Sequence, residues 1–479
     1  MKHWFDDALL INRDPNWYGW VAEDLSDREA AERSARTFFE QFTHDRITDM
    51  QLCVFENTSV IPSEAVMWRG LKYLQTEEDG HPVSYPKLGG LYRMYAELKT
   101  DPVLVFLDVM RRAGIRPWIT LRVNDAHFGG DETAFLRDDF FYEARDRGWM
   151  IGGEYGYFAH CLDWNAEPVR DRILGLIREI LGRYDLFGLE LDFMREPYCF
   201  DYRHCTDRHD VMNRFMASVS RMALEAGNRL GHPVRLMVRM PAEIGDAYAF
   251  GFDAGFWAKN RWIDAVVPTP RWEVTDSGIP VAEWKALVGE DVAAFPGLEC
   301  LHLDFTRLTR EEAKAYSAAW NAQGADGLYF NNHDYATPRH RAMYDLRRDT
   351  VTEGARRFVV TYQDIAAEPD TRRKPLPMKL DGEGTLSLRI GPVTERDHAA
   401  LILGFEGEPP AVRWNGHPLP PPDRIPPVTG EDESTGEPKA LTGEGTWACS
   451  CEGMRTDGPL TLTFDGRGIL RYVEIRMEN

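Results

Sequence analysis

Short apolar runs alternate with amphipathic segments along the first 350 residues. Eight of these runs have the length and composition of buried strands, and helical periodicity lies between most of them. Eight strand–helix units in series are typical of a (β/α)8 TIM barrel, so we expect the α/β fold class. The predicted strands are Ala8–Arg13, Met50–Phe55, Arg116–Val123, Gly188–Phe193, Val234–Met240, Ile263–Pro268, Glu299–Phe305 and Gly327–Asn331.

Capping residues mark helix starts in this region. Ser26 with Glu29 predicts one capping box, and Thr309 with Glu312 predicts another. The main alternative fold is a doubly wound sheet, which usually has a glycine-rich phosphate-binding turn after its first strand. Residues 12–17 read NRDPNW and contain no glycine, which favours the barrel.

The pattern changes near residue 355, beyond which short runs alternate with period two and helical patterns disappear. We therefore expect two domains, a catalytic barrel at 1–355 and a smaller C-terminal β-sandwich at 356–479. His417–Thr446 is rich in Pro, Gly and Glu and predicts a long exposed loop. The predicted sandwich strands are Arg357–Tyr362, Thr385–Arg389, Ala399–Phe405, Ala411–Trp414, Leu460–Phe464 and Tyr472–Arg476.

Composition limits the possible partners. The 479 residues include 77 acidic and 56 basic side chains, a net charge of −21. This charge repels nucleic acid and anionic membranes, so we expect neither as a partner. The seven cysteines are odd in number and lack paired zinc spacing, which indicates reduced thiols. The N-terminus lacks an apolar signal region and no run approaches a membrane span, so we expect a cytoplasmic protein.

Candidate chemistry lies where the barrel strands end, because barrels of this class hold their active sites at the carboxyl ends of the strands. Carboxylates and histidines occur at several of these ends, as acid–base chemistry requires. Arginines recur there as well. Each can pair with a neighbouring carboxylate, or some can face an anionic substrate, since guanidinium groups bind carboxylates in both settings. The arginines are Arg13, Arg122, Arg195, Arg239, Arg271 and Arg307.

The segment from residue 128 to 164 predicts a long loop with many aromatic side chains. Aromatic faces suit sugar rings, but the same residues can form a subsidiary core. His127, His302 and His333 could ligate a metal together with nearby carboxylates. The sequence has no HxH, HxxxH or HExxH pair, so we expect no metal and no other cofactor.

The fourth predicted strand carries Glu190 and Asp192 in alternation. A chitinase-type site would need a glutamate two residues after Asp192, and Met194 occupies that position. A retaining mechanism using Glu190, Asp192 or Glu56 is an alternative, because two carboxylates ~5 Å apart suffice for it. The other interpretation is a structural network with Arg195, Arg235 or Arg239 on the barrel floor.

Several segments resemble a known family. Cys161–Asn165, the helix after it and Gly188–Arg195 are similar to bacterial barrel glycoside hydrolases. More narrowly, the chain resembles the inverting exo-sialidases of glycoside hydrolase family 156. The likeness rests on Asp14 after the first strand, on Arg122 five residues before His127, and on Arg195 closing the fourth strand. An asparagine after the eighth strand and the barrel–sandwich order also fit.

This resemblance implies an exo-α-sialidase that acts with inversion on a terminal sialic acid. Asp14 and His127 would be the catalytic pair, with Asp14 as the base and His127 as the proton donor, or the reverse. Arg122 and Arg195 would hold the substrate carboxylate, with Arg239 and Asp192 as further binding residues. Asn331 or Asn332 would bind a ring hydroxyl or the N-acyl group, and analogy suggests a homodimer.

Two other functions stay open from the sequence. One is a glycosidase of different specificity centred on Glu190, Asp192 or Glu56. The other is a non-catalytic, glycan-binding barrel with a lectin-like sandwich. The first alternative predicts that activity depends on Glu190, whereas the resemblance predicts that it depends on Asp14 and His127.

Overall fold

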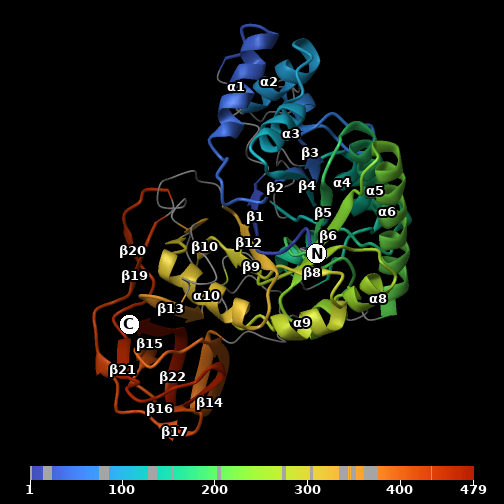
Figure 1. Cartoon of the computed structure of the whole chain (residues 1–479). Helices are drawn as coiled ribbons and strands as arrows, with labels where there is room; N and C mark the ends of the chain where they lie inside the picture. The colour runs from blue at the N-terminus through green and yellow to red at the C-terminus, as the bar shows by residue number, and fades with distance from the viewer. Residues whose placement is uncertain are drawn as a thin grey trace.

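A computed structural model shows the predicted order of a parallel barrel followed by an antiparallel domain (Figure 1). The barrel strands run through the centre of the first part, helices surround them, and the second domain lies beside the helix that precedes the last barrel strand. The structure describes residues 3–14, 24–74, 86–127, 137–153, 156–201, 207–271, 274, 277–302, 306–333, 343–344, 346, 352–360, 376–432 and 434–479.

The parallel sheet closes on itself. β8 and β9 are two parts of one stretch, separated by Phe295 and Pro296. Within this stretch Phe295 N donates to Val266 O on one side, and Pro296 O accepts from Tyr329 N on the other. The eight strand positions therefore form a barrel, which confirms the predicted fold class. The strands are β1 (Ala8–Arg13), β2 (Asp49–Glu56), β4 (Arg116–Arg122), β5 (Gly188–Asp192), β6 (Arg235–Pro241), β7 (Ala265–Thr269), β8 (Ala293–Ala294), β9 (Gly297–Glu299) and β12 (Gly327–Asn331).

The seventh strand lies earlier than the sequence pattern predicts. The prediction of Glu299–Phe305 is wrong, because the strand occupies residues 293–299 and ends at Glu299. After it, β10 (Leu301–His302) pairs antiparallel with β11 (Thr306–Arg307), and Asp304 lies outside the described residues. Pro296 and Gly297 read as a turn, since proline cannot donate to a sheet. In the structure both residues lie within the seventh strand of the barrel, between the parts labelled β8 and β9 or at the start of β9.

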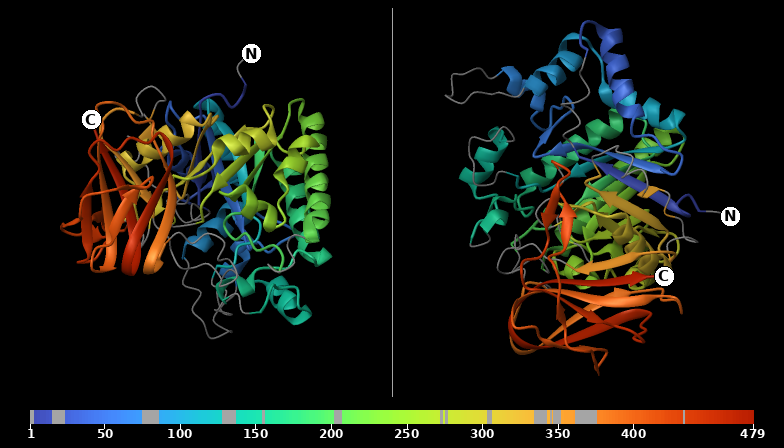
Figure 2. Two further views of the ribbon diagram at one scale, coloured as in Figure 1. Left: turned by 90° about the horizontal axis from the view of Figure 1, so that it is seen from below. Right: turned by 90° about the vertical axis from the view of Figure 1, so that its left-hand side faces the viewer.

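Helices cover the outside of the barrel (Figures 1 and 2). The predicted capping box of Thr309 and Glu312 is confirmed at the start of α10. The prediction for Ser26 is wrong, because Asp27 caps α1 by accepting from Ala30 N. The helices that follow the strands are α1 (Arg28–Glu40), α3 (Pro102–Arg112), α5 (Glu167–Arg183), α6 (His209–Leu230), α8 (Ala254–Lys259), α9 (Val281–Val288) and α10 (Arg310–Ala322).

Shorter elements occupy the loops. The segment predicted as one aromatic loop contains α4 (Asp139–Arg147) and a 3-10 turn at Gly156–His160. Its Phe158 and Trp164 are fully buried, so these two serve a core. The remaining loop elements are β3 (Thr58–Ser59), a 3-10 helix at Arg69–Leu74, α2 (Pro86–Tyr92), a π-helical turn at Arg93–Glu97 and α7 (Ile244–Ala249). The described part of the chain contains no helix that is both long and apolar enough to span a bilayer.

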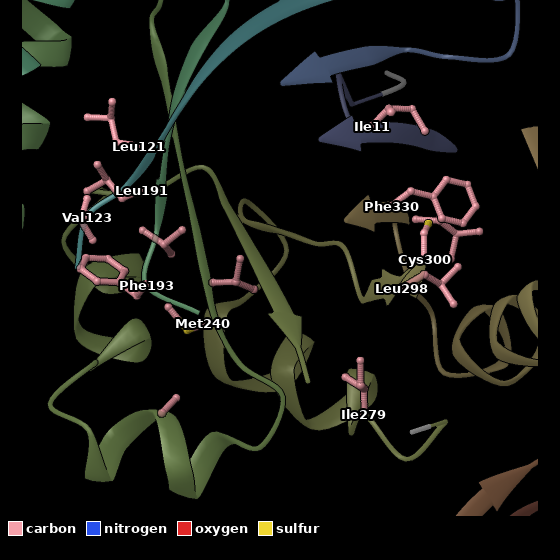
Figure 3. Close-up of a cluster of buried hydrophobic side chains, with 14 of the residues drawn as sticks. Ile11, Leu121, Val123, Leu191, Phe193, Met240, Ile279, Leu298, Cys300 and Phe330 are labelled. Carbon is pink, nitrogen blue, oxygen red and sulfur yellow. The ribbon is translucent and has the colours of Figure 1, made fainter. Parts of the chain in front are cut away.

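The apolar core lies between the strands and the helices. Figure 3 shows Leu121 and Leu191 on adjacent strands, with Val123 and Phe193 directly beyond them. All four side chains are at most 2% exposed. They alternate with polar residues, because successive side chains of a strand point to opposite faces. Arg122, which lies between Leu121 and Val123, therefore points into the barrel.

The barrel interior changes in character along its axis. The inward positions of β4 are Trp118, Thr120 and Arg122, in order from the floor to the rim. Those of β5 are Gly188, Glu190 and Asp192. The floor is an apolar plug, the next layer is polar, and the last is charged. The strand period alone thus delivers charged side chains to the carboxyl end of the barrel.

The C-terminal domain is the predicted β-sandwich, organised around one long strand. Its strand β22 runs from Gly458 to Glu478, with β14 and β16 beside its first half and β13 and β15 beside its second. The two predicted strands at 460–464 and 472–476 are therefore one. The other strands are β13 (Arg356–Val360), β14 (Met378–Ile390), β15 (His398–Gly407), β16 (Ala411–Trp414) and β21 (Thr446–Ser450).

The predicted loop at 417–446 contains four short strands. β17 (His417–Pro418) and β18 (Asp423–Arg424) extend the main sheet, and β19 (Thr429–Glu431) pairs with β20 (Pro438–Ala440) as a hairpin. This β19–β20 hairpin reaches the barrel. Arg307 of β11 lies 2.8 Å from Glu431, and Thr306 forms a strand bridge with Asp432. The second domain therefore holds the segment that follows the seventh barrel strand.

Gly327→Ala tests how tightly the barrel closes. A Cβ at this position would lie 2.2 Å from the carbonyl oxygen of Ala8 on the neighbouring strand, so we expect the free energy of unfolding to fall by about 1–3 kcal/mol. Gly182→Ala is the matched control, because a Cβ there meets no atom within 4 Å in helix α5. It should leave stability unchanged or raise it by up to about 1 kcal/mol. Equal urea midpoints for the two variants would contradict this packing.

Candidate active site

The carboxyl end of the barrel brings together residues that lie far apart in the sequence. Asp14 follows β1, Arg122 ends β4, and His127 lies five residues beyond Arg122 in the loop after β4. Arg195 follows β5, and Asn332 follows β12. Because parallel strands end at the same rim, all five side chains reach one region. The structure thus places these five predicted site residues together.

Arg122 is the centre of this region. Its guanidinium is 3% exposed and has three oxygen partners. Nη2 donates to Asp14 Oδ2 at 2.8 Å and lies 3.5 Å from Asn332 Oδ1. Nη1 donates to Glu56 Oε1 at 2.9 Å. Glu56 also accepts from Arg69 Nη2 at 3.0 Å, so one carboxylate links two buried guanidinium groups.

His127 lies between carboxylates on one side and a guanidinium on the other. Its Nδ1 is 2.6 Å from Asp125 Oδ1 and 2.9 Å from Glu56 Oε1. Asp125 Oδ1 also accepts from the backbone N–H of His127 at 2.7 Å. This is an aspartate turn, in which the side chain binds the backbone two residues on. On the opposite edge, Arg195 Nη2 contacts His127 Nε2.

The surrounding charges set the protonation of these groups. Burial lowers the pKa of His127, but Asp125 and Glu56 outweigh it and raise this pKa to about 9. Burial raises the pKa of Asp125, but His127 and Arg195 hold it well below its usual range. Burial and Asp125 raise the pKa of Glu56, but His127 and Arg122 bring it down to about 2. The imidazole is therefore held as a proton-carrying group between two carboxylates.

Arg195 acts against this protonation. A guanidinium can only donate, so its contact with Nε2 is satisfied when that nitrogen carries a lone pair. The carboxylates favour the imidazolium, and Arg195 favours the neutral ring with its hydrogen on Nδ1. His127 is 28% exposed, so solvent and a ligand can reach it. A ligand that binds Arg195 would shift the balance toward the imidazolium.

Arg239 and Asp192 form a buried pair at the level of Arg122, on the adjacent strands β6 and β5. Arg239 Nη1 donates to both Asp192 oxygens at 3.0 and 2.9 Å. Asp192 Oδ1 also accepts from the backbone N–H groups of Met194 and Arg195. These contacts position the turn that carries Arg195. The pairing matches the structural alternative from the sequence, and substrate binding by Arg239 or Asp192 stays a prediction.

Asn331 and Asn332 share one partner that the sequence did not indicate. Glu299 Oε2 accepts from Asn331 Nδ2 at 2.8 Å, and Glu299 Oε1 accepts from Asn332 Nδ2 at 3.0 Å. Asn332 has a φ of +52°, a left-handed conformation that asparagine adopts more readily than most residues. This backbone turn brings both asparagine amides to one carboxylate.

Glu190 lies one layer below the rim. It is fully buried and accepts from Asn12 Nδ2 at 3.3 Å and from the Thr120 hydroxyl. Burial and the nearby Asp192 raise the pKa of Glu190 to about 7. The hydroxyl of Tyr329 accepts from the same Asn12 amide at 2.7 Å, and its own hydrogen bond to Glu190 opposes the rise in the pKa of that carboxyl. A carboxyl at this depth suits a structural role better than contact with a glycoside.

The remaining rim arginines are paired. Arg271 lies 3.0 Å from Glu196, and Arg307 pairs with Glu431 of the second domain. Arg13 Nη1 donates to the backbone oxygen of His333, and its guanidinium lies 3.9 Å from the ring centre of Phe42. Pairing with carboxylates thus accounts for most of the arginines at the strand ends.

Glu56, Asp125 and His127 have the donor types of a metal site. One ligand atom from each lies within 4.8 Å of the others. The two carboxylates also contact Arg122, Arg69 and Arg195, whose positive charges compete with a cation for the carboxylate oxygens. The donor set therefore fits an ion-paired acid–base cluster better than a metal centre.

Asp125 and Glu299 are absent from the site predicted from the sequence. A signal for Asp125 exists, because an aspartate two residues before a candidate histidine can orient it. Glu299 was placed at the start of the seventh strand, and the structure places it at the end. A predicted strand that continued through Pro296 would have ended at Glu299 and placed this carboxylate at the rim.

Comparisons with known proteins give only distant likenesses. No protein-family model matches the sequence, and no curated protein matches it. The chain is similar to the PgaB (BpsB) glycoside hydrolase domain from Bordetella bronchiseptica, at 10% identity and a TM-score of 0.41, over 71% of this chain and 98% of that one. It is also similar to an alpha-L-fucosidase from Vibrio sp. strain EJY3, at 9% identity and a TM-score of 0.40, over 98% of this chain and 97% of that one. A third similar structure is a GH29 alpha-L-fucosidase from Bacteroides thetaiotaomicron, at 9% identity and a TM-score of 0.36, over 96% of this chain and 93% of that one. These values are too low to assign a family or a substrate.

Asp125→Asn tests the electrostatics of His127 without any substrate. The variant removes a negative charge 2.6 Å from Nδ1, so the pKa of His127 should fall from about 9 by about 1–3 pH units. NMR titration of the imidazole measures it. Asp185→Asn is the matched control, since Asp185 lies 2.8 Å from the exposed His232 and should change only the titration of that residue. An unchanged His127 titration would contradict the ion-paired arrangement.

Proposed function

We propose that the protein is an inverting glycosidase that removes terminal sialic acid, or a related nonulosonic acid, from glycosides. The observation that carries this proposal is the placement of Asp14 and His127 on either side of a shared Arg122–Glu56 link, with Arg195 at the far edge of the imidazole. None of the three similar structures is a sialidase. The sialoside specificity therefore rests on these arginines and on the sequence resemblance.

The chemistry of a sialoside explains the need for such a site. Its anomeric carbon carries a carboxylate, which repels a carboxylate nucleophile. An inverting enzyme avoids this contact by activating water, with acid and base ~6.5–9.5 Å apart. Asp14 and His127 are linked through the guanidinium of Arg122 and the carboxylate of Glu56. The proposal requires that the sugar and the attacking water bind between these two side chains.

The two groups divide the proton transfers. Asp14 accepts a proton from the water whose oxygen attacks the anomeric carbon. His127, held protonated by Asp125 and Glu56, donates a proton to the glycosidic oxygen as the bond from that oxygen to the anomeric carbon breaks. The substrate carboxylate competes for Arg122 and Arg195. Binding to Arg195 removes it from Nε2 and favours the imidazolium that donates the proton.

An aryl α-sialoside tests the proposed reaction directly. ¹H NMR should show the β-anomer of the free sugar first, before mutarotation. Asp14→Asn and His127→Ala should each lower kcat/KM by about 10²–10⁴-fold, the usual contribution of acid–base groups. Glu190→Gln should stay within about ten-fold of the wild type, because Glu190 lies buried below the rim.

Other outcomes separate the alternatives. Early release of the α-anomer would indicate a retaining enzyme, with Glu56 as a candidate. Loss of activity in Glu190→Gln alone would support the glycosidase centred on the fourth strand. Binding without turnover of sialosides, uronides and neutral glycosides would indicate a glycan-binding barrel.

The pH profile tests the role of His127. Its pKa is raised to about 9, and it must be protonated to donate, so kcat/KM should fall as the pH rises through about 9. Asp125→Asn lowers this pKa, so the basic limb should move to lower pH in that variant. Asp185→Asn should leave the profile unchanged. A basic limb at the same pH in Asp125→Asn would exclude His127 as its origin.

A further inference from the structure

We propose that Glu299 fixes the amide of Asn331 so that its carbonyl oxygen faces the bound sugar as a hydrogen-bond acceptor. Glu299 is then a positioning residue, and Asn331 selects a substrate group that donates a hydrogen bond. This inference rests on the proposed function, because it assigns part of the same substrate site.

The three side chains form a compact buried group. Glu299 ends β9 and Asn331 ends β12, and the two residues are direct partners in the parallel register. Glu299 is 2% exposed, Asn331 3% and Asn332 5%. Glu299 Oε1 accepts from both Asn332 Nδ2 and the backbone N–H of Leu301, whereas Oε2 accepts from Asn331 Nδ2.

Hydrogen-bond chemistry fixes which way each amide points. An ionised carboxylate only accepts, and an amide nitrogen only donates, so both nitrogens must face Glu299. The two carbonyl oxygens then point away from it. Asn332 Oδ1 lies 3.5 Å from Arg122 Nη2 and so helps to hold the central guanidinium.

The carbonyl oxygen of Asn331 is in a different position. It is buried, and the described residues offer it no hydrogen-bond donor. A buried acceptor without a partner costs about 1–3 kcal/mol, which a donor from a ligand can offset. Because an acceptor repels a carboxylate, Asn331 suits a hydroxyl or an acylamino N–H of the sugar. The substrate carboxylate is left to the arginines.

Glu299→Gln tests the orientation because glutamine has one acceptor and one donor. Its oxygen should stay at the Oε1 position, where two donors meet. Its nitrogen then faces Asn331 Nδ2, and two donors cannot share a hydrogen bond. The amide of Asn331 should therefore turn over and present N–H to the sugar. We expect KM to rise about ten-fold or more, with a smaller change in kcat.

A double variant distinguishes a positioning role of Glu299 from a purely structural one. Asn331→Asp added to Glu299→Gln moves the carboxylate from one residue to the other. Either oxygen of an aspartate is an acceptor, so one can accept from the glutamine and the other can face the sugar. KM should return to within about three-fold of the wild type. Glu299→Gln with an unchanged KM, or no rescue in the double variant, would overturn the proposal.

Glu474→Gln is the matched control for loss of a buried carboxylate. Glu474 is fully buried in the second domain, where it accepts from Arg357 and Tyr472. This variant should lower stability and leave KM unchanged. Equal KM increases in Glu474→Gln and Glu299→Gln would overturn the proposal by showing a general effect of destabilisation.

A measurement without substrate distinguishes failure of this inference from failure of the proposed function. If the wild type hydrolyses no aryl sialoside, the proposed function fails, and the amide orientation is tested by ¹⁵N–¹H NMR of the asparagine side chains. The Asn331 amide signals, assigned by their loss in Asn331→Asp, should shift strongly in Glu299→Gln. Signals that stay at their wild-type positions would overturn the orientation by Glu299.

Discussion

A positive charge held almost entirely out of water must be surrounded by oxygen atoms, and Arg122 imposes this constraint on the rim of the barrel. Its partners Asp14, Glu56 and Asn332 follow or end three different strands. Removing any of them would leave part of a buried guanidinium uncompensated, which is strongly destabilising. The three strand ends are therefore fixed relative to one another by one side chain, and His127 joins the group through Glu56.

The layers of the barrel interior offset the free-energy cost of burying these charges. Trp118, Met237 and Phe295 fill the floor and supply apolar burial that does not depend on the site. The polar layer of Asn12, Thr120 and Glu190 separates this floor from the charged rim. The buried charges that cost free energy and the apolar side chains that stabilise the fold thus lie at opposite ends of the same strands. The rim can therefore hold charged groups that a uniformly apolar core would exclude.

Much of the fold could be predicted because hydrophobic periodicity is a local property. Seven of the eight barrel strands lie where the pattern indicated. The seventh does not, because Pro296 and Gly297 imitate a turn that long-range pairing overrides. The same reason explains β22, whose Gly466 and Gly468 read as a turn and yet stay paired with β14 and β15.

The site could be predicted in part for a related reason. Asp14, Arg122 and His127 stand at recognisable strand ends, so their convergence follows from the barrel alone. Their partners cannot be read in this way, since the bond from Arg122 to Asp14 spans 108 residues and that to Asn332 spans 210. The sequence therefore indicated that these strand ends meet, but left open whether each arginine faces a carboxylate or a substrate.

The contact of the β19–β20 hairpin with the barrel has a consequence for how the two domains evolve. It joins the segment after the seventh barrel strand through Glu431 and Asp432. Glu299, which orients the two asparagines, lies a few residues before that segment. A recombination event that replaced the sandwich would also change what supports the mouth of the barrel. The two domains are therefore expected to diverge together in related proteins, as one unit of selection rather than as exchangeable modules.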